Sequence, residues 1–179
     1  AAVLVVQRWA ERAGTREAQE ALVSLFEESG RTEELVAALE QLDGVLDGAE
    51  RAANRRRLGY LHAAEGRLDD AIGAWREALR HDAGDLASLE ALAEALVEAN
   101  REGELLALCD ALGSDVLLAP HVEVLRARAL ERAGRLPEAA ARFRALRAAG
   151  AVDDESLAGL ERTARALGDG ASLADALFG

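Results

Sequence analysis

Apolar residues recur with the period of an α-helix along most of the chain, and small residues interrupt this pattern at regular points. In residues 58–79, the apolar side chains lie three or four positions apart on both sides of Gly66. This spacing places them on one face of a helix. Glycine ends many helices because it enters the left-handed conformation without a steric penalty. The stretch therefore predicts two antiparallel amphipathic helices joined by a short turn.

The same arrangement returns along the chain every 34 residues. Before residue 52 it fits at an offset of 36, and we place the two extra residues in 42–50, which holds two Asp-Gly pairs. A fixed period of this size is typical of stacked helix pairs, in which each pair buries its apolar faces against its neighbours. The residues expected to end the first helix of each pair are Gly30, Gly66, Asn100, Gly134 and Gly168.

The repeat resembles that of the tetratricopeptide repeat (TPR) family, whose pattern is W-x2-L-G-x2-Y, then A-x3-F, then P. Residues 52–85 carry Leu58-Gly59 and, further on, Ala71 four residues before Trp75, with three residues between them. The resemblance implies an all-α fold, a right-handed α-solenoid of antiparallel helix pairs without a sheet. The departures in this unit are Arg55 for Trp, His62 for Tyr and Ala83 for Pro.

We expect a single TPR-like array over residues 1–179, with about five repeats and a partial unit at the N-terminus. The expected units are 1–15 (partial), 16–51, 52–85, 86–119, 120–153 and 154–179. The expected helices lie near 2–13, 16–29, 32–43, 51–65, 68–81, 85–99, 102–113, 120–133, 136–149, 153–167 and 170–178.

The pattern also predicts which residues form the core. Small Gly59 and Ala71 allow two helices to approach closely, and large Trp75 fills the space beside them. The side chains expected to be buried at the repeated positions are Leu39, Leu58, Trp75, Leu92, Cys109, Leu130, Phe143 and Leu160.

Composition supports a folded helical protein: 50% of residues are hydrophobic, 30% are charged and strand-favouring residues are scarce. The net charge of −12 weighs against nucleic-acid binding, which needs clustered positive charge. The apolar run 1–6 is too short to insert into a membrane. All 21 basic residues are Arg, which favours a GC-rich bacterial genome. Because Met is absent, we expect a processed chain or part of a longer protein.

Side chains that could carry catalysis or hold a metal do not cluster in the sequence, so we expect neither an enzyme nor a cofactor. Cys109 occupies an aromatic position of its repeat, and His62 replaces a packing Tyr, so both are interpreted as structural. Adjacent Asp residues in 66–71 and 151–156 are expected to cap helices. The Gly-rich stretch 168–172 is interpreted as a helix–helix turn.

The resemblance assigns function to the surface, because the first helix of each TPR pair lines a concave groove. Positions 2, 5, 9 and 12 of each unit would face a ligand there. Tyr60 beside Arg56 would be a plausible anchor, since Tyr and Arg are enriched at interface hot spots. The alternative is that these charges have no binding role and are solvated or pair with one another between neighbouring helices. The candidate partner-binding residues are Arg56, Tyr60, Glu90, Glu94, His121, Arg128 and Arg162.

The function predicted from the sequence is a protein–protein interaction scaffold that binds a protein or peptide segment. One alternative is a structural subunit that stacks end to end, with self-association through Trp9 and the Leu173–Phe178 face. Another is a regulatory domain of a longer signalling protein or enzyme. A chaperone-tail clamp is disfavoured, because the Lys that such clamps use is absent.

Overall fold

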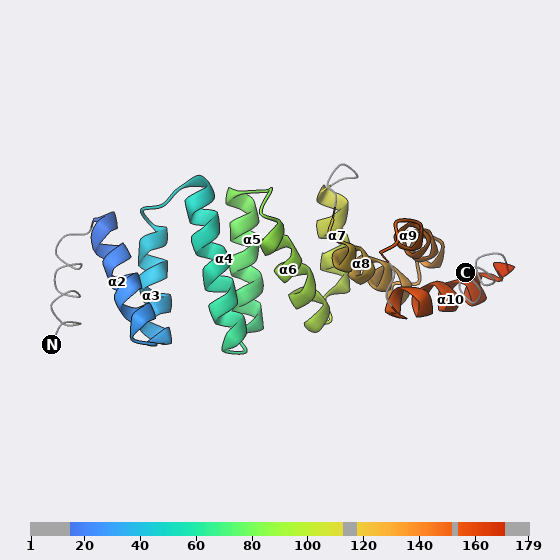
Figure 1. The fold of residues 1–179 in the computed structure, drawn as a ribbon, viewed down its shortest axis with the longest axis horizontal. Coiled ribbons are helices and arrows are strands. Elements are labelled where there is room, and N and C mark those ends of the chain that lie inside the picture. Colours follow the sequence, from blue (N-terminus) through green and yellow to red (C-terminus); the bar gives the residue numbers. More distant parts are fainter. Residues whose placement is uncertain (1–14, 113–117, 152–153, 171–179) are drawn as a thin grey trace. The chain divides into compact units, whose positions relative to one another are not determined.

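A computed structural model describes residues 15–112, 118–151 and 154–170. Every regular element in these ranges is an α-helix (Figure 1), so the fold class is all-α as predicted. Each helix lies within three residues of its expected bounds, whereas the expected helix 2–13 and nearly all of 170–178 fall outside the described residues. The helices are α2 (Arg16–Glu28), α3 (Thr32–Asp43), α4 (Gly48–Ala64), α5 (Leu68–His81), α6 (Leu86–Glu98), α7 (Glu102–Leu112), α8 (Pro120–Arg132), α9 (Leu136–Ala148) and α10 (Asp154–Leu167).

The chain divides into an N-terminal unit, residues 1–92, and a C-terminal unit, residues 93–179, with the boundary inside α6. In the N-terminal unit, α2 packs on α3, α4 packs on α5, and α3 also contacts α4. In the C-terminal unit, α8 contacts α7, α9 and α10, and α9 contacts α10. Helices therefore pack mainly on their neighbours in sequence, as a repeat architecture requires.

The predicted turn residues end the first helices by one shared geometry. Gly66 has φ of 72°, and Asn100, at 54°, is the one non-glycine residue with positive φ in the described ranges. After Gly66, the Arg67 N–H donates to the carbonyl of His62 at 2.9 Å, a bond that satisfies one of the last carbonyls of α4. The left-handed residue is thus confirmed as the stop signal at each of these helix ends. The equivalent bonds join Arg31 to Phe26, Arg101 to Leu96, Arg135 to Leu130 and Asp169 to Ala164.

The expected aspartate caps are wrong where the structure describes them. The N-cap residue of α5 is Arg67 rather than an aspartate, and its side chain makes no capping hydrogen bond. Asp69 and Asp70 are the second and third residues of α5, in the first turn, where the helix dipole favours their negative charge. In 151–156, Asp154 likewise begins α10, and the residue before it lies outside the described ranges.

The core predictions are confirmed at all eight positions, each of which is at most 3% exposed. The predicted close approach is also present, because a Cβ at Gly59 would lie 2.4 Å from Nε1 of Trp75. The C-terminal unit has a second such contact, which the sequence did not predict. There, a Cβ at Gly159 of α10 would lie 2.3 Å from Cζ of Phe143 in α9.

Candidate partner-binding face

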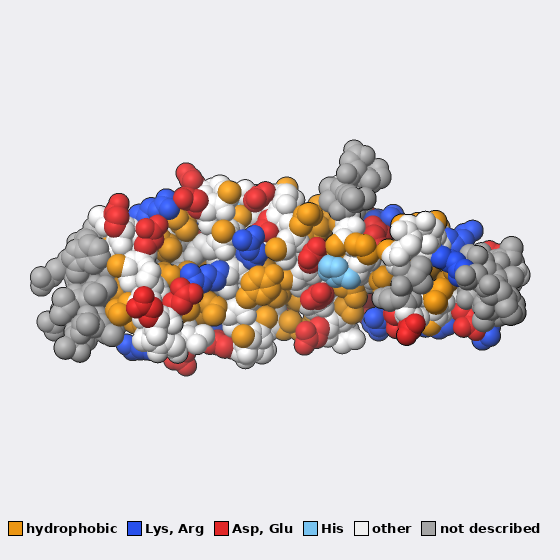
Figure 2. All heavy atoms as spheres, in the orientation of Figure 1, with side chains coloured by type: hydrophobic (Ala, Val, Ile, Leu, Met, Phe, Trp, Pro, Cys, Tyr) orange, Lys and Arg blue, Asp and Glu red, His pale blue; other side chains and the backbone are white. Residues whose placement is uncertain are grey.

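The first helices of the repeats, α2, α4, α6, α8 and α10, each present a stripe of accessible residues. We call the positions 2, 5, 9 and 12 of the five units the first-helix face. Of these twenty residues only Val124 is buried, at 7% exposure, because α8 packs against three other helices; its expected exposure is therefore wrong. On the side of the molecule seen in Figure 2, acidic, basic and apolar side chains are intermingled. The residues of the first-helix face are Glu17, Glu20, Ser24, Glu27, Ala53, Arg56, Tyr60, Ala63, Ala87, Glu90, Glu94, Val97, His121, Val124, Arg128, Glu131, Glu155, Ala158, Arg162 and Arg165.

Position 9 of one first helix repeatedly contacts position 2 of the next, 27 residues later. The N-terminal unit has one such contact and the C-terminal unit has two. The steps from α4 to α6, from α6 to α8 and from α8 to α10 therefore share one register. The contacts are a long hydrogen bond from the Tyr60 hydroxyl to the Ala87 carbonyl (3.5 Å), an approach of His121 Nε2 to the Glu94 carboxylate (3.8 Å) and an ion pair between Arg128 and Glu155 (3.5 Å).

Further ion pairs join neighbouring first helices at separations of about one repeat. In the N-terminal unit, Arg16 of α2 forms a two-pronged pair with Glu50 of α4, both contacts being 2.8 Å. In the C-terminal unit, Arg162 of α10 donates two hydrogen bonds to the carboxylate of Glu131 of α8, at 2.8 and 2.9 Å. These hydrogen bonds to Glu131 raise the pKa of the Arg162 guanidinium. The alternative that face charges pair between neighbouring helices is therefore confirmed for Arg162 and Glu131, whereas Arg16 and Glu50 lie outside the first-helix face.

Arg56 has a structural partner, which the sequence reasoning missed. Its Nη1 lies 2.6 Å from the carboxylate of Asp85, whose side chain is only 4% exposed. Asp85 also accepts hydrogen bonds from the hydroxyl (2.7 Å) and N–H (3.3 Å) of Ser88. Burial raises the pKa of Asp85, but the bonds from Ser88 and Arg56 outweigh it and hold that pKa below its usual value. The sequence did contain a signal for this site: an Asp directly before a predicted helix, with a Ser three residues later, is a helix-capping pattern.

Tyr60 is the exposed aromatic group of the candidate set. It is 49% exposed, and its ring meets buried Trp75 edge to face, with centroids 5.4 Å apart and planes at 72°. Leu86, which is 50% exposed, adjoins Ala87, the acceptor of the Tyr60 hydroxyl. The ring is thus held from behind while its outer part faces solvent.

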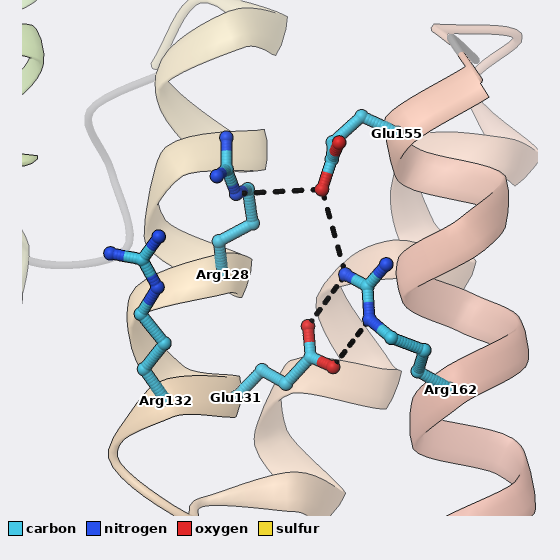
Figure 3. Close-up of a pocket in the computed structure, with 5 residues that line it drawn as sticks. All are labelled: Arg128, Glu131, Arg132, Glu155 and Arg162. Atoms are coloured by element: carbon cyan, nitrogen blue, oxygen red, sulfur yellow. Dashed lines mark hydrogen bonds and ion pairs between the residues drawn. The ribbon is translucent and has the colours of Figure 1, made fainter.

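A pocket of about 300 Å³ opens between α8 and α10 in the C-terminal unit (Figure 3). It brings together two predicted candidates, Arg128 and Arg162, with three side chains absent from the candidate set. The sequence could have indicated Glu131 and Glu155, since both lie on the first-helix face. The residues that line the pocket are Arg128, Glu131, Arg132, Glu155 and Arg162.

A metal site, a membrane-spanning helix and a reactive cysteine each make a specific requirement of the described residues. No group of three His, Cys, Asp or Glu residues in the described ranges could hold a metal ion. Over the same ranges, every helix is too short or too polar to cross a membrane. Cys109 is 1% exposed, and burial raises the pKa of its thiol, so the reactive thiolate is disfavoured.

Helix pairs that repeat about every 34 residues, with a left-handed residue at the end of each first helix, define a TPR-like α-solenoid fold, and known structures agree. MamA AMB-1 superposes with a TM-score of 0.64 at 16% identity, over 88% of this chain and 91% of that one. A tetratricopeptide repeat protein from Parabacteroides merdae gives 0.69 at 14% identity, over 90% and 63%. PilF from Pseudomonas aeruginosa gives 0.61 at 15% identity, over 96% and 78%. No protein-family model and no curated protein matches the sequence.

Proposed function

We propose that this chain is a non-catalytic protein–protein interaction scaffold that binds a polypeptide segment of mixed charge on its first-helix face. The observation that carries the proposal is Tyr60, half exposed on that face and fixed from behind by Trp75. The TPR-like fold supports the same class of function. All seven candidate residues are at least partly accessible, as a docking surface requires.

Tyr60 is suited to anchor a partner because its side chain would lose little conformational entropy on binding. A ring already held by Trp75 loses less side-chain freedom than a free one. Tyr is also enriched among the few residues that dominate binding energy at interfaces. Leu86, next to the acceptor of the Tyr60 hydroxyl, extends the apolar surface available to a partner.

The charged candidates have a different task in this proposal. Glu90, Glu94, His121, Arg128 and Arg162 carry both signs, so a partner of mixed charge can find complementary groups in either unit. Charges at the rim of an interface mainly set register and encounter rate. Arg56 acts indirectly, by fixing Asp85 and the start of α6.

The test compares partner binding by the wild-type chain, Tyr60→Ala and Tyr60→Phe, after a partner has been captured on the immobilised chain. Tyr60→Ala should weaken binding about tenfold or more, the effect of removing a hot-spot aromatic. Tyr60→Phe keeps the ring and should bind nearly as wild type, because the hydroxyl makes only a long hydrogen bond.

The matched control is Arg80→Ala, which removes an exposed side chain from the second helix α5. Its binding should equal that of the wild type, and thermal unfolding of each variant shows whether the fold is intact. If folded Tyr60→Ala and Arg80→Ala bind equally well, the first-helix face is not the docking surface.

The alternative of end-to-end stacking concerns other parts of the chain. Trp9 and the Leu173–Phe178 face lie outside the described residues. Their predicted contacts stay a prediction, which sedimentation of the chain can test.

A further inference from the structure

The side chains of the pocket between α8 and α10 differ in how fully they are paired. Glu131 accepts two hydrogen bonds from Arg162, at 2.8 and 2.9 Å. Arg132 is paired with Glu102 of α7, and Figure 3 shows its guanidinium away from the carboxylates of Glu131 and Glu155. These groups already have close hydrogen-bonding partners, so a ligand would add little to their pairing.

Arg128 is held much more loosely. Within the described residues its one polar contact joins Nε to the Glu155 carboxylate at 3.5 Å. Ion pairs with strong hydrogen bonds are shorter, about 2.7–2.9 Å. The same Glu155 oxygen also lies 3.5 Å from Nη2 of Arg162, so Arg128 shares this acceptor with a second guanidinium. A guanidinium carries five N–H donors, and most of those on Arg128 are available to a ligand.

The order of charges across the pocket indicates the sign of that ligand. Glu131, Arg162, Glu155 and Arg128 form a chain of alternating charge in which Arg128 is the last member (Figure 3). The next member of such a chain is an anion. Nearby Glu155 disfavours a doubly charged anion such as phosphate, whereas a planar carboxylate carries one charge and matches the guanidinium fork.

We infer that this pocket binds an Asp or Glu side chain of a docked polypeptide, whose carboxylate takes Arg128 over from Glu155. The inference rests on the proposed scaffold function and gives the bound segment an acidic residue at the α8–α10 step. A pocket of about 300 Å³ has room for such a side chain and some water. Glu155, which is 45% exposed, keeps Arg162 as its partner.

The direct test titrates the full chain with short peptides and follows the arginine Nε–H signals by NMR. The probe is an N-acetylated, C-amidated peptide with one Glu among Gly, Ser and Ala, and its match carries Gln instead. The Glu peptide should shift the Arg128 signal in the millimolar range, and the Gln peptide should need about tenfold more. Equal responses to the two peptides, or none, would overturn the inference.

Three variants separate a ligand site from a purely internal ion-pair network. Arg128→Gln should weaken binding of the Glu peptide about tenfold, since a charged hydrogen-bonding partner is lost. Glu155→Gln should strengthen it, because the internal competitor for Arg128 is removed. Arg135→Gln removes an exposed charge that pairs with Glu138 at the start of the second helix α9, outside the first-helix face, and should leave binding within about twofold of wild type. Weaker binding by Glu155→Gln would contradict the exchange of partners.

Two further probes identify the source of the anion. A peptide with a free C-terminus and no acidic side chain tests for a terminal carboxylate, and inorganic phosphate tests for a dianion. Both should bind more weakly than the Glu peptide; tighter binding of either one overturns the inference. If Tyr60→Ala no longer binds the partner while binding of the Glu peptide does not depend on Arg128, only the pocket inference fails. If the Glu peptide needs Arg128 but Tyr60→Ala keeps the partner, the proposed function fails instead.

Discussion

Two glycines set how closely neighbouring helices approach in this protein. Gly59 faces Trp75 within the pair α4 and α5, whereas Gly159 faces Phe143 across the step from α9 to α10. The same device, an aromatic side chain seated on a helical glycine, thus serves within one pair and between successive pairs. At both positions the missing Cβ, rather than backbone freedom, makes glycine necessary, because neither residue has positive φ.

Gly59→Ala should destabilise the chain, although alanine is the better helix former. The added Cβ meets the Trp75 indole at 2.4 Å, and overpacking of this kind costs about 1–3 kcal/mol. The gain in helix propensity offsets at most about 1 kcal/mol. The control is Gly73→Ala in α5, where nothing lies within 4 Å of the new Cβ, and this change should stabilise by about 0.5–1 kcal/mol. Urea unfolding of both variants measures the difference, and equal shifts in the same direction would contradict the close contact.

At the scale of elements, the first helix of each pair is ended by its own local sequence, whereas charged side chains connect it to the next repeat. The stop is local: a left-handed Gly or Asn, with a hydrogen bond back to the last turn. The connections reach across about one repeat, as in Arg16–Glu50 and Arg162–Glu131. Exposed pairs of this kind contribute little, about 0–1 kcal/mol each. Buried Asp85, which joins α4 to the start of α6, should matter more.

Asp85 should make stability depend on pH in the acid range. Its folded pKa lies below the usual 3.8, so its contribution is complete above the unfolded value and is lost as pH falls through the lower folded value. Asp85→Asn should cost about 1–3 kcal/mol at neutral pH, because charged hydrogen bonds are lost, and should flatten the fall in stability below about pH 4. Urea unfolding from pH 2 to 7 provides the measurement. An unchanged acid slope in Asp85→Asn would show that other carboxylates cause it.

At the scale of the whole molecule, each described helix depends mainly on its neighbours in sequence. The N-terminal unit has its own core cluster, which includes Leu22, Phe26, Leu39 and Leu58. The C-terminal unit buries Phe143 and Leu160. In repeat proteins, stability is approximately a sum of repeat and nearest-neighbour terms, so damage to one repeat stays largely local.

Trp75→Ala should therefore weaken the two units unequally. Loss of a buried aromatic side chain costs about 3–5 kcal/mol. Amide hydrogen exchange should speed up most in α4, α5 and the helices that pack on them, and least in α8 to α10. Phe143→Ala should give the opposite distribution. Equal loss of protection in both units from either substitution would mean that the chain unfolds as one cooperative body.

The sequence by itself determined the helices, their ends and their buried faces, because these depend on local chemistry. The 3.6-residue period fixes which side chains share a face, so Leu39, Trp75 and Cys109 could be assigned to the core. A left-handed backbone needs Gly or Asn, so Gly66 and Asn100 could be identified as helix ends. Each of these properties is set within a few residues along the chain.

Only the tertiary structure decided which polar groups meet. Arg56 was predicted to face a ligand, yet it pairs with Asp85, and Arg162 pairs with Glu131 while Arg128 is left with one long contact. Such pairings depend on the register and separation of helices about 30 residues apart, which the pattern of one helix does not contain. Hydrophobic burial tolerates small changes in register, whereas an ion pair with strong hydrogen bonds requires its atoms within about 3 Å. For this physical reason the sequence indicated the surface of the candidate site, and the structure decided which of its charges are available.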